Sequence, residues 1–147
     1  MIVWGADEFF ARWLIARLDD PDVTEPNDFG NYRACGVASG SRLYAAVVYS
    51  GWQRGSGNIM MSIASDSPRW ATRSNIRELL GMPFTVLGCN RITSIIRDDN
   101  IKSMRLAEGV GFVKEGALRG EHPKIIYGLL RSEYSDPSKL LRQRRVS

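Results

Sequence analysis

The chain has 147 residues, of which 44% are hydrophobic and 24% are charged, which is ordinary for a globular domain with its own core. No apolar run approaches the roughly 18 residues that a membrane-spanning helix needs, and the first residues lack the basic and apolar segments of a secretory signal. Cys35 and Cys89 stand alone, without the spacing of a metal site. We therefore predict a reduced, cytoplasmic protein with no bound metal and no membrane contact.

The formal net charge of +4 comes from the C-terminus. Residues 139–147 contain four basic residues and no acidic one, whereas the rest of the chain holds 16 basic and 16 acidic residues. We predict a single domain over residues 1–138, followed by a basic tail. Because no aromatic side chain lies between the charges of the tail, we do not expect it to bind nucleic acid.

The first half of the chain indicates a helix followed by strands. Apolar residues recur with helical spacing over 6–18. The loop over 19–31 is rich in Pro, Asp and Asn, and its acidic side chains could attract a cationic ligand. Residues 32–50 indicate two strands joined by a turn centred on Gly40. After a second turn, residues 58–65 are predicted to form a third strand.

The second half alternates helices and strands. The apolar period is helical within 66–83, and Gly81 and Pro83 are expected to end that helix. Three residues fit its N-cap: Ser67, Thr72 and Ser74. The remaining predicted elements are a strand at 89–97, a helix at 100–111, and strands at 112–120 and 124–131.

This element order predicts a mixed α/β fold. Hairpins and helical crossovers both occur, so the central sheet should contain parallel and antiparallel strands, six or seven in total, with helices on both faces. The order is helix, three strands, helix, strand, helix and two strands, and a short opening strand within residues 1–4 remains open.

Polar residues lie on the inner face of the last predicted helix. Asn100, Ser103, Ala107 and Val110 share one helical stripe whose far end is apolar, so the stripe faces the core. Asn100 and Ser103 then point inward near the positive end of the helix dipole. Two interpretations remain open. The pair binds a polar ligand, or Asn100 is an N-cap and Ser103 bonds back to the helix.

The same segment resembles a known family. The pattern Asn-x-x-Ser-x-Arg-Leu, followed by Gly-Phe-x-x-Glu-Gly, is similar to the last helix and next strand of the GNAT superfamily of N-acetyltransferases. Its positions here are Asn100, Ser103, Arg105, Leu106, Gly111, Phe112, Glu115 and Gly116. The branch that acetylates protein N-termini, ribosomal proteins among them, is the most similar. The resemblance is strong over residues 89–134, moderate over 42–88 and weak before that.

The resemblance implies that acetyl-CoA is a cosubstrate. It implies a V-shaped opening between the strands at 58–65 and 89–97, where splayed backbones leave N–H and C=O groups for the pantetheine amides. The diphosphate would lie at the start of the helix that follows the first of these strands. The implied cofactor-binding residues are Ile63, Ala64, Ser65, Arg69, Trp70, Ala71, Thr72, Arg73, Ser74, Asn100, Ser103 and Arg105.

Three departures from the family pattern concern the chemistry. Thr72 and Ser74 stand where the family's phosphate loop has glycines, and glycine lets phosphate approach the backbone closely. Ala107 replaces a tyrosine that protonates the leaving thiolate in many members. The resemblance then implies Ser103 as the catalytic residue, through a hydrogen bond or a water relay.

The third departure is that the strand at 58–65 has no carboxylate to act as a base. The remaining candidates are Asp66, Glu25, Asp28 and Glu121, while His122 is expected to be an exposed turn residue.

Two functions follow as hypotheses. The first is an enzyme in which a primary amine, from a protein N-terminus or a small molecule, attacks acetyl-CoA directly. The second is a GNAT-fold protein without catalysis, retained for a structural or assembly role. The amine substrate is the expected partner in the first case, and a homodimer remains open in both.

Overall fold

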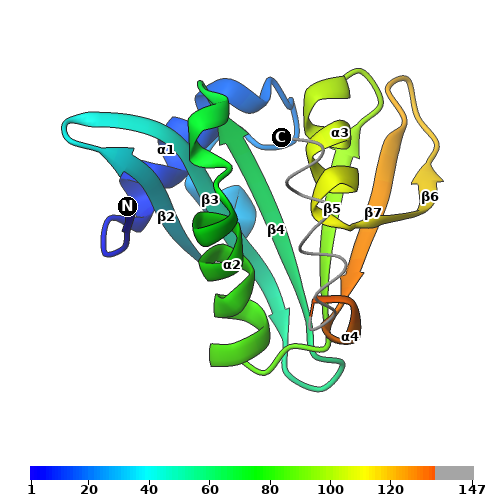
Figure 1. The fold of residues 1–147 in the computed structure, drawn as a ribbon. Coiled ribbons are helices and arrows are strands. Elements are labelled where there is room, and N and C mark those ends of the chain that lie inside the picture. The colour runs from blue at the N-terminus through cyan, green and yellow to red at the C-terminus, as the bar shows by residue number, and fades with distance from the viewer. Residues whose placement is uncertain (135–147) are drawn as a thin grey trace.

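A computed structural model describes residues 1–134, and the predicted basic tail at 139–147 lies outside the described residues. The chain forms one seven-stranded sheet in the order β1-β2-β3-β4-β5-β7-β6, with helices on both faces (Figure 1). The predicted mixed α/β architecture is therefore confirmed, and the short opening strand that the sequence left open is present. Within residues 1–134 no helix is long and apolar enough to cross a membrane.

The strands and helices follow the predicted order closely. The strands are β1 (Ile2–Val3), β2 (Tyr32–Ser39), β3 (Arg42–Gln53), β4 (Asn58–Ser65), β5 (Arg91–Arg97), β6 (Val113–Leu118) and β7 (Lys124–Leu130). The α-helices are α1 (Asp7–Leu18), α2 (Arg73–Gly81), α3 (Ile101–Val110) and α4 (Arg131–Tyr134). Shorter helical turns are η1 (Pro26–Phe29), η2 (Pro68–Trp70) and η3 (Met82–Val86).

All neighbouring strands are antiparallel except one pair. β4 and β5 run parallel, because α2 and η3 carry the chain back to the start of the sheet between them. This pair joins the antiparallel strands β1–β4 to the antiparallel strands β5–β7. The seam between the two halves of the sheet is therefore the one place where the strand pattern changes.

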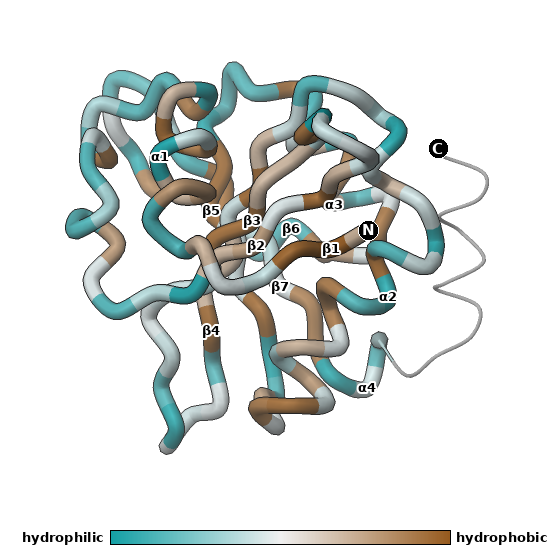
Figure 2. Tube along the Cα trace, turned by 90° about the vertical axis from the view of Figure 1, so that its left-hand side faces the viewer, coloured by the Kyte–Doolittle hydropathy of each residue, from teal (hydrophilic) through white to brown (hydrophobic). Residues whose placement is uncertain are grey.

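The two faces of the sheet have separate apolar clusters. Phe10, Ala11 and Leu14 of α1 pack on β2, β3 and β4 from one side. On the other side, α2 and α3 cover the larger cluster, which includes Tyr49 and Tyr127. Figure 2 shows hydrophobic segments along the strands inside the molecule and hydrophilic segments in the surrounding loops.

The helix predicted within 66–83 is divided into three parts. Ser67 Oγ accepts a hydrogen bond from the Arg69 N–H at the start of η2, and Thr72 Oγ1 accepts one from the Asn75 N–H at the start of α2. Two side-chain caps thus begin two separate helical turns. The helical segment does not end at Gly81 and Pro83 as predicted. It continues in a wider π-helical turn, in which the Leu87 N–H donates to the Met82 carbonyl five residues back.

The short helix α3 has a side-chain cap at one end and a glycine at the other. Asn100 Oδ1 accepts the Ser103 N–H at 3.2 Å, so the N-cap interpretation of Asn100 is confirmed. Gly111 has φ = 115°, a conformation that side chains rarely adopt, and its N–H donates to the carbonyls of Ala107 and Glu108. The chain can therefore leave the helix and enter β6 without a long loop.

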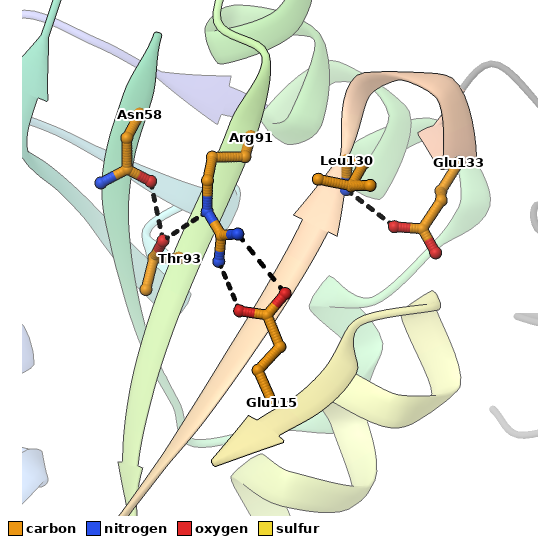
Figure 3. A network of polar contacts seen from close by, with 6 residues as sticks. All are labelled: Asn58, Arg91, Thr93, Glu115, Leu130 and Glu133. Atoms are coloured by element: carbon orange, nitrogen blue, oxygen red, sulfur yellow. Dashed lines mark hydrogen bonds and ion pairs between the residues drawn. The ribbon is translucent and has the colours of Figure 1, made fainter. Parts of the chain in front are cut away.

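A polar network ties the seam strands together on the sheet face away from α3 (Figure 3). Arg91 Nη2 lies 2.7 Å from Glu115 Oε1, and Arg91 Nε donates to Thr93 Oγ1. The Thr93 hydroxyl in turn donates to Asn58 Oδ1 on β4 at 2.7 Å. Gly128 lies beneath the ion pair, where a Cβ would collide with both charged groups. This network fixes the paired end of β4 and β5.

Candidate active site

The parallel strands β4 and β5 are paired at one end only. Their backbone register covers three residue pairs and ends at Met60 and Thr93, although both strands continue. Beyond this point the strands diverge, as the V between them in Figure 1 shows. The opening that the sequence predicted between these two strands is therefore present.

The orientation of the β4 backbone can be read from its hydrogen bonds. The Asp66 N–H donates to Tyr44 of β3, whereas the Met61 carbonyl accepts Ser94 Oγ of β5 at 2.7 Å. The Ser65 carbonyl likewise faces away from β3, toward Lys102 Nζ at 3.5 Å. Because backbone groups alternate along a strand, the N–H and C=O of Ile63 also face the opening.

Two adjoining cavities, of about 590 and 630 Å³, meet at this opening. Both are lined by Ile63, Trp70, Asn100 and Ser103. The first cavity passes between the strands, since its walls include Met60 and Ser62, on the α1 side of β4, as well as side chains of α2 and α3. The second cavity lies between the end of β4, the following loop and α3. A ligand entering from either side of the sheet can thus reach the same point.

Most of the predicted cofactor residues line these cavities. Those in the walls are Ile63, Ala64, Ser65, Trp70, Ala71, Asn100, Ser103 and Arg105. Those outside both walls are Arg69, Thr72, Arg73 and Ser74. The strand and α3 parts of the predicted site therefore come together, while most of the predicted phosphate loop lies apart from the cavity walls.

The start of α2 explains why the phosphate loop differs. Thr72 Oγ1 accepts the Asn75 N–H at 3.1 Å, and the Asn75 side chain donates to the Trp70 carbonyl at 2.9 Å. The Thr72 hydroxyl thus takes the Asn75 N–H, a donor of the kind that the start of a helix otherwise offers to a phosphate. Positive charge lies instead on α3, where Lys102 and Arg105 line the second cavity. Lys102 was missed from the sequence because it lies outside the family pattern.

The carboxylates predicted as bases do not line either cavity. Asp66 forms a two-pronged ion pair with Arg17, at 2.8 and 2.9 Å, and the Arg17 hydrogen bond lowers the pKa of Asp66. Asp28 accepts the N–H groups of Thr24 and Glu25, which lowers its pKa also. Glu25, Glu121 and His122 lie outside both cavity walls. Asp66 and Asp28 therefore serve local structure.

Three acidic residues line the first cavity: Asp19 and Asp20, from the loop whose acidic side chains were expected to attract a cation, and Asp99, which the sequence analysis did not name. Asp99 pairs with Arg97 at 2.9 Å, and Asp20 lies 3.6 Å from Lys124. The Asp19 carboxylate has no ion-pair or hydrogen-bond partner among residues 1–134. It is thus the acidic group of this wall that remains available to a cation.

Asp19 is held in an uncommon backbone conformation. It caps the end of α1 with φ = 52° and ψ = 41°, the left-handed region that few side chains adopt. Its carbonyl accepts a hydrogen bond from Arg97 Nη1 of β5 at 2.8 Å. The contact fixes the start of the acidic loop against the diverging strand. The sequence signal for Asp19 was its place in the acidic loop that directly follows the α1 periodicity.

Ser103 and the thiols complete the description of reactive side chains. Ser103 is half-buried and lines both cavities. Cys35 and Cys89 are buried free thiols, and burial raises the pKa of Cys35 to about 12. Within residues 1–134, no three His, Cys, Asp or Glu side chains are grouped so that they could hold a metal ion. Ser103 is therefore a hydroxyl residue that lines both cavities, and its backbone N–H is held by the Asn100 cap of α3.

Solved structures with a similar fold include acetyltransferases. Two structures of the spermidine N-acetyltransferase SpeG from Vibrio cholerae, each with a point substitution, have TM-scores of 0.71 and 0.73 to this chain at 17% and 18% identity. Both alignments cover 94% of this chain, and they cover 99% and 97% of the SpeG chains. A third structure, assigned as an acetyltransferase without a named substrate, has a TM-score of 0.73 at 17% identity, covering 98% and 91%.

No protein-family model matches the sequence, and no curated protein sequence matches it either. The similarity therefore lies in the order and arrangement of the elements, over nearly the whole length of both chains. The protein has the α/β fold of the GNAT N-acetyltransferases.

Proposed function

We propose that the protein transfers an acetyl group from acetyl-CoA to a cationic primary amine. The observation that carries this proposal is the opening between β4 and β5, where two cavities meet beside unpaired backbone groups. Two substrates can approach this point from opposite faces of the sheet, which is the geometry that a direct transfer needs. The fold shared with acetyltransferases supports the same activity.

The second cavity suits the donor. The Ile63 C=O can accept a hydrogen bond from an amide of the pantetheine arm, which leaves the Ile63 N–H for the reacting carbonyl. Lys102 and Arg105 supply positive charge for the phosphates of the donor. Asn100 and Ser103 lie where the arm would pass from this cavity to the opening. In this proposal the diphosphate relies on cationic side chains of α3 more than on a glycine-rich loop.

The first cavity suits the acceptor on its α1 side. Asp19 offers an unpaired carboxylate there, and Asp20 and Asp99 add negative charge that Lys124 and Arg97 partly neutralise. Such a wall favours an ammonium group and raises its local concentration. The acceptor is a protein N-terminus, as the sequence resemblance implies, or a small polyamine of the kind named for SpeG.

The proposed reaction has no covalent enzyme intermediate. The ammonium first loses one proton to water. The neutral amine then attacks the thioester carbon, the new C–N bond forms, and the C–S bond breaks to release the thiolate. A strand N–H facing the opening stabilises the oxyanion that develops on the carbonyl. The proton lost by nitrogen ends on the sulfur of CoA, and the Ser103 hydroxyl can donate a hydrogen bond to that sulfur as it leaves.

Binding and turnover of acetyl-CoA test this proposal directly. At acetyl-CoA concentrations a hundred times the Kd, the free energy of unfolding should rise by about 2.7 kcal/mol, measurable as a thermal shift. Thiol release should then depend on an added amine, with spermidine and an unblocked peptide as the two acceptors. The absence of any thermal shift at millimolar acetyl-CoA would overturn the proposal.

A second candidate function is a GNAT-fold protein without catalysis. The observation in its favour is that Thr72 and Asn75 use the start of α2 for internal hydrogen bonds. This alternative predicts no thermal shift with acetyl-CoA and no thiol release with either acceptor. The same experiment therefore decides between the two functions.

Asp19→Asn should weaken binding of the amine without weakening binding of acetyl-CoA. Loss of a charged hydrogen bond costs about 1.5–3 kcal/mol, so the KM for the amine should rise tenfold to a hundredfold. Steady-state kinetics at saturating acetyl-CoA measure this change. Asp98→Asn is the matched control, because Asp98 is exposed and outside both cavity walls. An equal rise in KM for both variants would assign the effect to overall charge.

A further inference from the structure

We propose that this site accepts acyl groups longer than acetyl, with the chain lying in an apolar recess between α2 and α3 beside Ala107. The inference rests on the proposed transfer function and extends it to the donor. It follows from the size and lining of the first cavity on the helix side of the sheet.

The part of the first cavity that α2 and α3 line is mostly apolar. Its lining side chains include Ile76, Leu79 and Leu80 of α2 and Leu106 and Val110 of α3. The charged groups of α3, Lys102, Arg105 and Glu108, line only the second cavity, whereas Asn100 and Ser103 lie where the two cavities meet. A donor whose polar arm follows the second cavity would thus reach the opening with its acyl group facing apolar side chains.

Ala107 leaves space at the centre of this wall. It is 9% exposed, belongs to the main apolar cluster and lines the first cavity from the inner face of α3. A larger side chain there would project across the recess toward α2. Water in such a recess finds few hydrogen-bond partners, so an apolar chain can displace it at low cost.

The expected gain in binding affinity can be stated for each methylene of the acyl chain. Burying one CH₂ group stabilises a complex by about 0.8 kcal/mol, which corresponds to about fourfold tighter binding. An acetyl group provides one methyl for this wall, whereas butanoyl and hexanoyl groups add two and four methylenes. Affinity should therefore rise along the series until the chain fills the recess.

The test measures the Kd of acetyl-, butanoyl- and hexanoyl-CoA by calorimetry on the full chain without an amine, so that no turnover occurs. Butanoyl-CoA should bind about fifteenfold more tightly than acetyl-CoA, at about fourfold for each of its two added methylenes. Ala107→Phe should abolish the preference for hexanoyl-CoA, and Ala107→Val, a smaller change that the core tolerates more easily, should reduce it. Ala117→Phe is the control, because Ala117 is exposed on β6 and outside both cavities.

The outcomes separate this inference from the proposed function. If acetyl-CoA binds and the longer donors bind equally or more weakly, the inference fails while the transfer function stands. If no acyl-CoA binds, the transfer function itself fails. An unchanged chain-length preference in both Ala107 variants would also overturn the assignment of the recess.

Discussion

Replacing Gly36 by alanine is expected to lower the free energy of unfolding by about 1–3 kcal/mol, the usual cost of overpacking a core. Gly36 lies on β2 beneath α1, and a Cβ there would lie 2.5 Å from Cε1 of Phe10 and 2.7 Å from Cδ1 of Leu43. The Phe10 ring is only 5% exposed, so it cannot swing into solvent. Relief of the collision requires α1 to move away from β2 and β3.

Urea denaturation of the two proteins measures this loss as a lower midpoint with an unchanged slope. Gly116→Ala is the matched control, because a Cβ at Gly116 meets nothing within 4 Å. That control should be neutral or stabilising by up to about 1 kcal/mol, since alanine restricts the unfolded chain. Adding Phe10→Leu should recover part of the loss at Gly36 through a favourable coupling. Equal midpoints for the two alanine variants would contradict the packing argument.

The fold could be predicted from the sequence because its elements carry local signals. Each signal comes from residues that are close together in the sequence: the apolar stripe of α1, the turn at Gly40 and the change from strand to helical period after β4. The sequence predicted the ends of strands and loops less accurately where contacts between distant residues determine them. β3 continues to Gln53, past Gly51 at φ = 61°, and the acidic loop contains the 3₁₀ turn η1, closed by the side chains of Glu25 and Asp28.

The candidate site could be predicted in part, for a related reason. Ile63 and Ser103 belong to segments whose period or spacing is recognisable, and both line the opening. Asp19 and Lys102 reach the cavities through the contact of α1 with the sheet and the position of α3 over the diverging strands. These arrangements depend on the whole fold. The sequence offered Thr72 as one of three N-cap candidates, but it could not show which of them caps α2.

Ile63→Pro should lower kcat/KM for acetyl-CoA by a hundredfold to a thousandfold, the range found when one donor to an oxyanion is removed. Proline has no N–H, and the Ile63 N–H faces the opening, where β5 has already diverged. The bonds that join β4 to β3 come from the neighbouring residues, such as the Asp66 N–H to the Tyr44 carbonyl. Proline is tolerated on a strand where the missing N–H is on an unpaired edge, so the sheet should keep its pairing.

The matched variant is Ala64→Pro, one residue further along β4. Its missing N–H faces β3, opposite Ala46, so the change removes a ladder hydrogen bond and leaves a buried acceptor unpaired, which should cost about 1–3 kcal/mol of stability. Kinetics and urea denaturation of both variants together locate the function of the Ile63 N–H. A folded Ile63→Pro protein with unchanged kcat/KM would remove this N–H from the reaction. An equal loss of unfolding free energy in the two proline variants would instead mean that β4 is hydrogen-bonded on both sides at residues 63 and 64. The splayed edge then could not serve the donor, because its backbone groups would already be satisfied within the sheet.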